Sequence, residues 1–127
     1  MKIYLTRHGQ VVSRGIDGNV QYPVGDPPLS KLGRQQAACL GAYMKHIGFS
    51  GTLYSSPYAR ALETAEIIAQ HTGSQIVPWA PMREIVKKKE GILPFTGLTL
   101  EQIRAKYSHI AAHAELPYPW WTLEAET

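Results

Sequence analysis

The order of apolar and polar positions along the chain predicts alternating strands and helices. Residues 2–6 form a short, β-rich run that is apolar on both faces, as expected of a central parallel strand. Residues 52–55 predict a second strand, and residues 75–79 predict a short third one. Because proline has no N–H to donate to a neighbouring strand, Pro78 places the third strand at a sheet edge or ends it there.

Two helices are predicted between these strands. The first spans about residues 31–47, with Ser30 as its N-cap and Gly48 as its stop signal. The second spans about residues 58–72 and is closed by Gly73. Apolar residues at helical spacing give each helix a core-facing side: Ala37, Leu40, Met44 and Ile47 on the first, and Ala61, Ala65, Ile68 and Ala69 on the second.

A third helix is predicted to open at the capping box Thr99-Leu100-Glu101-Gln102, with Ile103, Tyr107 and Ile110 on its inner side. Residues 10–28 contain three glycines and three prolines, so they are expected to form a loop. The resulting order, strand–helix–strand–helix–strand, implies parallel strands joined by right-handed crossovers. The sequence therefore predicts an α/β fold.

Length and composition are those of one ordinary globular domain. The chain has 127 residues, of which 44% are hydrophobic and 18% are charged. No apolar run approaches the roughly 20 residues of a membrane span, and the N-terminus lacks the pattern of a secretory signal. We therefore expect a cytoplasmic protein with no membrane partner. The formal charge of +3, with no basic helix face interleaved with aromatics, also argues against a nucleic-acid partner.

Two further features of the sequence are a lone cysteine and a basic run. Cys39 is the single cysteine and falls inside the first predicted helix, so a buried, inert thiol is expected. Lys87-Lys88-Lys89 is the one basic run. It is either a solvated loop or a lip that attracts an anionic substrate, in which case residues 85–98 form the rim of the site.

Arg7-His8-Gly9 directly follows the first predicted strand. In open α/β sheets, ligands bind at the carboxyl ends of the strands. Histidine can act as a nucleophile, and the planar fork of arginine matches the oxygens of a phosphate. The three residues alone are also compatible with a strand end that carries two polar side chains by chance.

Two further residues extend this pattern. Arg60 lies in the first turn of the second predicted helix, where free N–H groups and the helix dipole favour anions; it either binds an anion or is an ordinary surface arginine. Glu84 follows the third strand at the same edge of the sheet. Together, Arg7 and Arg60 would hold a phosphoryl group, His8 would attack phosphorus, and Glu84 would protonate the leaving oxygen. No paired carboxylates or closely spaced His and Cys residues point to a metal, so we expect phosphoryl transfer without metal or cofactor.

Three ordered blocks resemble the histidine phosphatase superfamily, which contains phosphoglycerate mutases and related phosphatases. They are Leu5-Thr6-Arg7-His8-Gly9-Gln10, Pro28 through Gly33 with Gln36-Ala37, and Ser56 through Ala65, and the resemblance covers about residues 1–84. It implies a three-layer α/β/α sandwich with a mostly parallel sheet. It also implies transient phosphorylation of His8, with Arg7 and Arg60 binding the phosphoryl oxygens and Glu84 where many members keep their proton donor.

The chain departs from the family pattern in two places. Val11, Ser13 and Arg14 stand where members commonly carry a threonine and, a few residues later, an asparagine. The second histidine of the family, usually in a serine–histidine–glycine segment after a later central strand, is not in this chain. His109 lies in a similar segment, but that segment lacks the glycine and falls in a predicted helix, so His109 and His113 are interpreted as helix-surface residues.

Residues 122–127 resemble the start of the helix that precedes the missing strand. We therefore expect residues 1–127 to be a single histidine phosphatase-like domain that lacks the C-terminal part of its fold and is a poor catalyst alone. The predicted function is hydrolysis of a small phosphorylated metabolite, a phosphate monoester, through a phosphohistidine at His8.

Two alternatives stay open. The first is phosphoglycerate mutase-type phosphotransfer, which the modest segment after Glu84 disfavours because mutases generally use a longer insertion to enclose a bisphosphate. The second is a non-catalytic phospho-ligand binding module, if the second histidine is truly absent.

Overall fold

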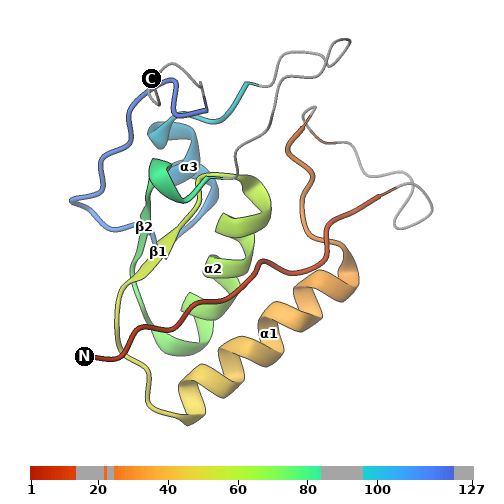
Figure 1. Ribbon diagram of the computed structural model, residues 1–127, viewed down its shortest axis with the longest axis vertical. Coiled ribbons are helices and arrows are strands. Elements are labelled where there is room, and N and C mark those ends of the chain that lie inside the picture. Colours follow the sequence, from red (N-terminus) through yellow and green to blue (C-terminus); the bar gives the residue numbers. More distant parts are fainter. Residues whose placement is uncertain (14–21, 23–24, 84–95, 122–127) are drawn as a thin grey trace.

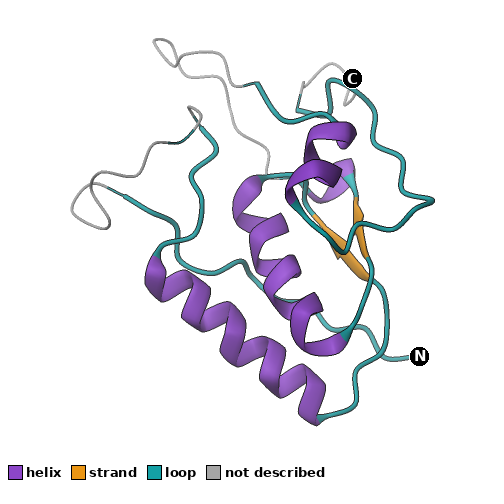
Figure 2. Cartoon of the chain, turned by 180° about the vertical axis from the view of Figure 1, so that it is seen from behind, coloured by secondary structure: helices purple, strands orange, loops and turns teal. Residues whose placement is uncertain are grey.

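The computed structural model describes residues 1–13, 22, 25–83 and 96–121. Along the chain, the elements are α1 (Lys31–His46), β1 (Leu53–Ser55), α2 (Ala59–Thr72), β2 (Ile76–Pro78), the short 3₁₀ helix η1 (Ala80–Met82) and α3 (Leu100–Lys106). Helices α1 and α2 lie side by side, and the two strands lie on the far side of α2 from α1 (Figures 1 and 2).

The strand–helix–strand unit predicted from the sequence is present. Strands β1 and β2 pair in parallel, with Leu53 opposite Ile76 and Ser55 opposite Pro78, and α2 connects them. Strand β2 ends at Pro78, as predicted, since a proline cannot continue the ladder. On its other side, Ile76 forms an isolated parallel bridge with Ile110. Helices with a small parallel sheet confirm the α/β class.

Local capping signals set the helix ends. The Ser30 hydroxyl accepts a hydrogen bond from the Gly33 N–H at the start of α1, and Thr99 forms the predicted capping box at the start of α3. Gly73 closes α2 in the left-handed conformation, with φ of 73°, and Gly48 follows α1 with φ of 76°. These four positions confirm the predicted starts of α1 and α3 and the predicted ends of α1 and α2.

Two predictions about the buried face of α1 are wrong. Cys39 is exposed, because it lies two residues, or about 200° of helical rotation, from the buried Ala37. Ile47 is 39% exposed, because it is the C-cap residue beyond the last turn. Ala37 and Met44 are buried as predicted.

The main core joins α2, β2 and α3. Its buried members are Leu62, Ala65, Ala69, Ile76, Ile103 and Tyr107. Helix α3 ends at Lys106, earlier than predicted, and Tyr107 has extended backbone angles. The chain leaves the helix here because Ile110 pairs with Ile76 and because Ser108 and His109 bond to Glu66 of α2. Tyr107 and Ile110 therefore reach the core from outside the helix.

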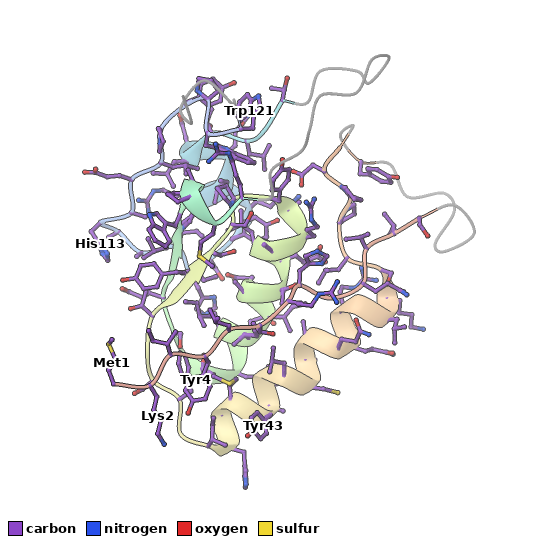
Figure 3. The ribbon with its side chains drawn as sticks, viewed as in Figure 1. Met1, Lys2, Tyr4, Tyr43, His113 and Trp121 are labelled. Carbon is purple, nitrogen blue, oxygen red and sulfur yellow. The ribbon has the colours of Figure 1, made fainter. Side chains whose placement is uncertain are left out.

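The predicted strand over residues 2–6 is wrong. These residues have no strand conformation, and Ile3 and Leu5 are 72% and 88% exposed. No backbone–backbone hydrogen bond joins them to another part of the described chain. A buried central strand needs neighbours on both sides, and β1 is paired only with β2. The segment crosses in front of α2 in Figure 1, and Met1 and Lys2 project away from the helices in Figure 3.

None of the helices in the described ranges combines the length and apolar character that a membrane crossing requires.

Candidate active site

The segment that carries His8 is held between α1 and α2 by hydrogen bonds to its backbone. The Gly9 N–H donates to the Thr64 hydroxyl of α2 at 3.1 Å, and the Gln10 N–H donates to the side-chain oxygen of Gln36 of α1 at 2.9 Å. The Ser30 N–H donates to the Gln10 carbonyl at 2.8 Å. The position of His8 is therefore set by both helices.

Two glycines allow this segment to approach the first turn of α1. A Cβ atom on Gly9 would overlap the carbonyl oxygen of Gly33, and a Cβ atom on Gly33 would overlap the carbonyl oxygen of Gln10. Because the obstructing atoms belong to the backbone, they cannot rotate away. Glycine is required at both positions for this close contact.

A hydrogen bond fixes the protonation pattern of the His8 ring. Its Nδ1 atom lies 2.7 Å from the carbonyl oxygen of Gly9. A carbonyl oxygen only accepts hydrogen bonds, so we assign the hydrogen to Nδ1. In the neutral ring the lone pair is then on Nε2. A half-buried imidazole in this tautomer is equipped to act as a nucleophile through Nε2.

The three residues predicted to bind and attack a phosphoryl group line one cavity of about 270 Å³. Arg7 and His8 enter it from the N-terminal segment, and Arg60 enters it from the first turn of α2. The cavity is completed mainly by residues of β1 and α2 and by Met82 of η1. A second hollow of about 300 Å³ lies on the α1 side of His8, lined by Gln36 and Leu40. The three side chains that the sequence places in one site thus line the same cavity.

Arg60 is a buried residue of this site. Only 9% of its surface is exposed, which excludes the alternative of an ordinary surface arginine. Its guanidinium carbon lies 4.3 Å from the centre of the Tyr58 ring, the geometry of a cation–π contact. A cation at the N-terminal turn of a helix is electrostatically unfavourable, so the aromatic ring offsets part of that cost.

A buried carboxylate supports the same turn of α2. The Asp26 side chain accepts a hydrogen bond from the Ala59 N–H at 2.7 Å and is 4% exposed. Burial raises the pKa of Asp26, while the hydrogen bond from Ala59 and the positive charges of Arg60 and Lys106 oppose the rise. Asp26 could not be recognised from the sequence as a residue of this site, because it lies in the predicted loop and meets Ala59 only in the folded chain.

Glu84, the predicted proton donor, lies outside the described residues, as do Arg14 and Lys87 to Lys89. Ser13, the other residue near the expected asparagine position, is exposed.

His109 is neither in a helix nor a simple surface residue, contrary to the prediction. Its Nδ1 atom lies 2.8 Å from Glu66 Oε1, and the Ser108 hydroxyl donates to the same oxygen at 2.5 Å. Burial raises the pKa of Glu66, but hydrogen bonds from Ser108 and His109 and the nearby charge of His109 outweigh it, so the net pKa is lowered. This cluster fastens the chain after α3 to α2. His113, by contrast, is exposed at the edge of the molecule (Figure 3).

Within the described ranges, no group of three or more His, Cys, Asp or Glu side chains is arranged to hold a metal ion.

A cavity that the N-terminal segment lines with Arg7 and His8 and a parallel βαβ unit lines with Arg60 is suited to binding a phosphoryl group. The chain belongs to the histidine phosphatase superfamily (branch 1), whose family model matches residues 3–123.

Similar proteins include two bacterial relatives. The probable phosphoglycerate mutase GpmB of Escherichia coli O1:K1 / APEC is 35% identical over 88 residues, which cover 67% of this chain and 38% of that protein. The protein of the same name from Citrobacter koseri is 36% identical over the same length. The chain therefore spans about two-fifths of the length of these curated relatives.

A solved structure shares the fold. The ecdysone phosphate phosphatase from Bombix mori, crystallised in complex with tungstate, aligns with a TM-score of 0.63. Sequence identity is 18%, and the alignment covers 85% of this chain and 54% of that one. The match confirms the expected α/β fold of histidine phosphatases.

Proposed function

We propose that the protein hydrolyses a small phosphate monoester through a phosphohistidine at His8. In the first step, His8 Nε2 forms a bond to phosphorus, the bond to the ester oxygen breaks, and Glu84 donates a proton to the departing oxygen. In the second step, water attacks phosphorus, the Glu84 carboxylate takes up a proton from that water, the Nε2–phosphorus bond breaks, and inorganic phosphate leaves. The observation that supports this most directly is the hydrogen bond from His8 Nδ1 to the Gly9 carbonyl, which leaves Nε2 as the nucleophilic nitrogen.

Arg7 and Arg60 are proposed to bind the phosphoryl oxygens. Both line the cavity that His8 lines, and charge-assisted hydrogen bonds of this kind contribute about 1.5–3 kcal/mol each. The burial of Arg60 strengthens its contact, because less water screens the charges. The role of Glu84 rests on its place in the sequence after η1 and on the family resemblance.

Mutase-type phosphotransfer is a second candidate, favoured by the relatives named phosphoglycerate mutase GpmB. Both reactions pass through the same phosphohistidine. They differ in the fate of the phosphoryl group, which goes to water in hydrolysis and returns to a substrate hydroxyl in a mutase. Release of inorganic phosphate, measured against transfer between 2- and 3-phosphoglycerate, separates the two.

The test of the shared chemistry is covalent labelling. Incubation with a ³²P-labelled phosphate monoester should give protein-bound phosphate that is labile in acid and stable in alkali, and peptide mapping should place it on His8. His8→Ala should abolish the label, whereas His46→Ala, at the exposed end of α1, should keep it. Label that survives in His8→Ala would contradict the mechanism. Oxyanion binding without label or phosphate release would instead indicate a non-catalytic binding module.

A further inference from the structure

Arg60 is held by an aromatic residue that sequence analysis did not single out. Tyr58 is the N-cap residue of α2, two positions before Arg60, and the guanidinium carbon lies 4.3 Å from its ring centre. The guanidinium carbon lies over the ring, the geometry of a cation–π contact. Arginine binds phosphate oxygens through N–H donors that lie in the plane of the guanidinium, so the orientation of that group decides how well it binds an oxyanion.

The Tyr58 ring also packs against the ring of Trp120. Tyr58 is 5% exposed and Trp120 is 2% exposed, and their rings meet edge to face with centroids 5.2 Å apart. The indole N–H of Trp120 donates to the Leu98 carbonyl at 2.8 Å. A series of contacts therefore runs from Arg60 to Tyr58, from Tyr58 to Trp120, and from Trp120 to the backbone of Leu98 before α3. Each contact limits the movement of the two side chains or segments that it joins.

A long arginine side chain loses rotamer freedom when it binds an anion, and this loss weakens binding. A guanidinium that is already held against an aromatic ring has lost part of that freedom before the anion arrives. We propose that Tyr58, which packs against Trp120, is a positioning residue that holds Arg60 at the cavity shared with His8 and thereby raises the affinity for a tetrahedral oxyanion. The proposal rests on the proposed function, because it requires Arg60 to be the oxyanion ligand.

The experiment measures tungstate affinity by isothermal titration calorimetry for the protein and three variants. Tyr58→Leu removes the ring but keeps an apolar side chain, and it should weaken tungstate binding by about 5- to 30-fold, the range expected for a partly desolvated cation–π contact. Tyr58→Phe keeps the ring and should restore affinity to within about 2-fold. Tyr107→Leu makes the same replacement at another buried tyrosine of the core, and it should lower the melting temperature without weakening tungstate binding.

Several outcomes would overturn the positioning role. These are unchanged affinity in Tyr58→Leu, equal losses in Tyr58→Leu and Tyr58→Phe, or a loss in Tyr107→Leu as large as that in Tyr58→Leu. If Tyr58→Leu lacks the native circular dichroism spectrum, Tyr58→Met takes its place, because methionine fills irregular apolar space.

Arg60→Met separates this inference from the proposed function. If Arg60→Met weakens tungstate binding but Tyr58→Leu does not, only the positioning role fails. If Arg60→Met binds tungstate as the unaltered protein does, or if the unaltered protein binds none, the proposed function fails as well.

Discussion

Gly9 and Gly33 touch backbone to backbone where the His8 segment meets α1. The carbonyl oxygens that a Cβ atom would meet belong to Gly33 and Gln10, and both are held in the structure, Gln10 by its hydrogen bonds to Ser30 and Gln36. A methyl group at either glycine can be accommodated only if the His8 segment moves away from α1.

Gly33→Ala is therefore expected to lower the free energy of unfolding by about 1–3 kcal/mol, the range for overpacking a tightly packed contact. The shift of the His8 segment should also reduce any labelling of His8. Urea denaturation measures the first effect. Gly51→Ala is the matched control, because the atoms nearest to its Cβ would belong to the ring of Phe49, which can turn aside. Equal stability losses in the two variants would contradict this account.

Single residues were predictable where their chemistry is tied to a local signal. Arg7, His8 and Arg60 stand in recognisable blocks, and the structure brings all three to one cavity. The predicted burial of Cys39 and Ile47 was wrong, because helical periodicity alone does not fix where a buried face ends along the helix or how far it extends around it. Asp26 and Glu66 were missed because their partners lie far away in the sequence. Tyr58 was missed because the Trp120 ring that packs against it is equally distant, although Arg60 is only two positions away.

At the scale of elements, α2 depends on a residue outside itself. The side chain of the N-cap residue Tyr58 forms no capping hydrogen bond. The Ala59 N–H donates instead to the side chain of Asp26, which lies 33 residues earlier in the sequence. This contact joins the loop before α1 to the turn that carries Arg60. Glu63 adds a second one, because it accepts from the Leu29 N–H at 2.9 Å.

Asp26→Ala should lower the free energy of unfolding by about 1–3 kcal/mol, because it leaves a buried N–H unpaired at the start of α2. Asp26→Asn keeps an oxygen acceptor and should cost less. Because burial raises the pKa of Asp26, the folded state binds its proton more tightly than the unfolded state, so the stability linked to this group is lost as pH rises through the folded pKa.

Asp26→Asn has no carboxyl group to ionise, so its free energy of unfolding should not fall with pH in this way. The difference in stability between Asp26→Asn and the unaltered protein should therefore become smaller as pH rises. Chemical denaturation at several pH values measures the difference. A loss in Asp26→Asn as large as that in Asp26→Ala at neutral pH would show that the hydrogen bond to Ala59 is not what supports the helix.

Elements were predictable where their ends carry short-range signals. Ser30, Gly73 and Thr99 cap or close the helices as expected, and the pairing of β1 with β2 follows from the connecting helix. The strand over residues 2–6 was wrong because composition shows only that a segment suits a sheet, and a strand also needs a hydrogen-bonded neighbour. The predicted end of α3 was wrong, because the pairing of Ile110 with Ile76 takes the chain out of the helix despite its helical spacing of apolar residues.

At the scale of the whole molecule, Glu66 joins α2 to the chain that follows α3. Its net pKa is lowered from the ordinary value of 4.5, so the unfolded chain binds this proton more readily than the folded one. The stabilisation is fully present above the unfolded pKa and is lost as pH falls through the lower, folded pKa.

Glu66→Gln should therefore destabilise the protein most at neutral pH, and the difference from the unaltered protein should narrow as pH falls below about 4.5. Thermal unfolding followed by circular dichroism from neutral to acidic pH tests this. Glu101→Gln, an exposed position in α3, should leave the pH profile unchanged. A gap between Glu66→Gln and the unaltered protein that stays constant with pH would contradict the role of the ionised carboxylate.

The hydroxyl of Thr64 has a consequence for motion in the site. Its single hydrogen is directed to the carbonyl of Arg60, one turn back in α2, at 2.8 Å, so only its lone pairs face the Gly9 N–H. The Thr64 hydroxyl oxygen thus connects the N-terminal segment that carries His8 to the turn of α2 that carries Arg60. Fluctuations of these two groups should be correlated, so that their separation varies less than the position of either one.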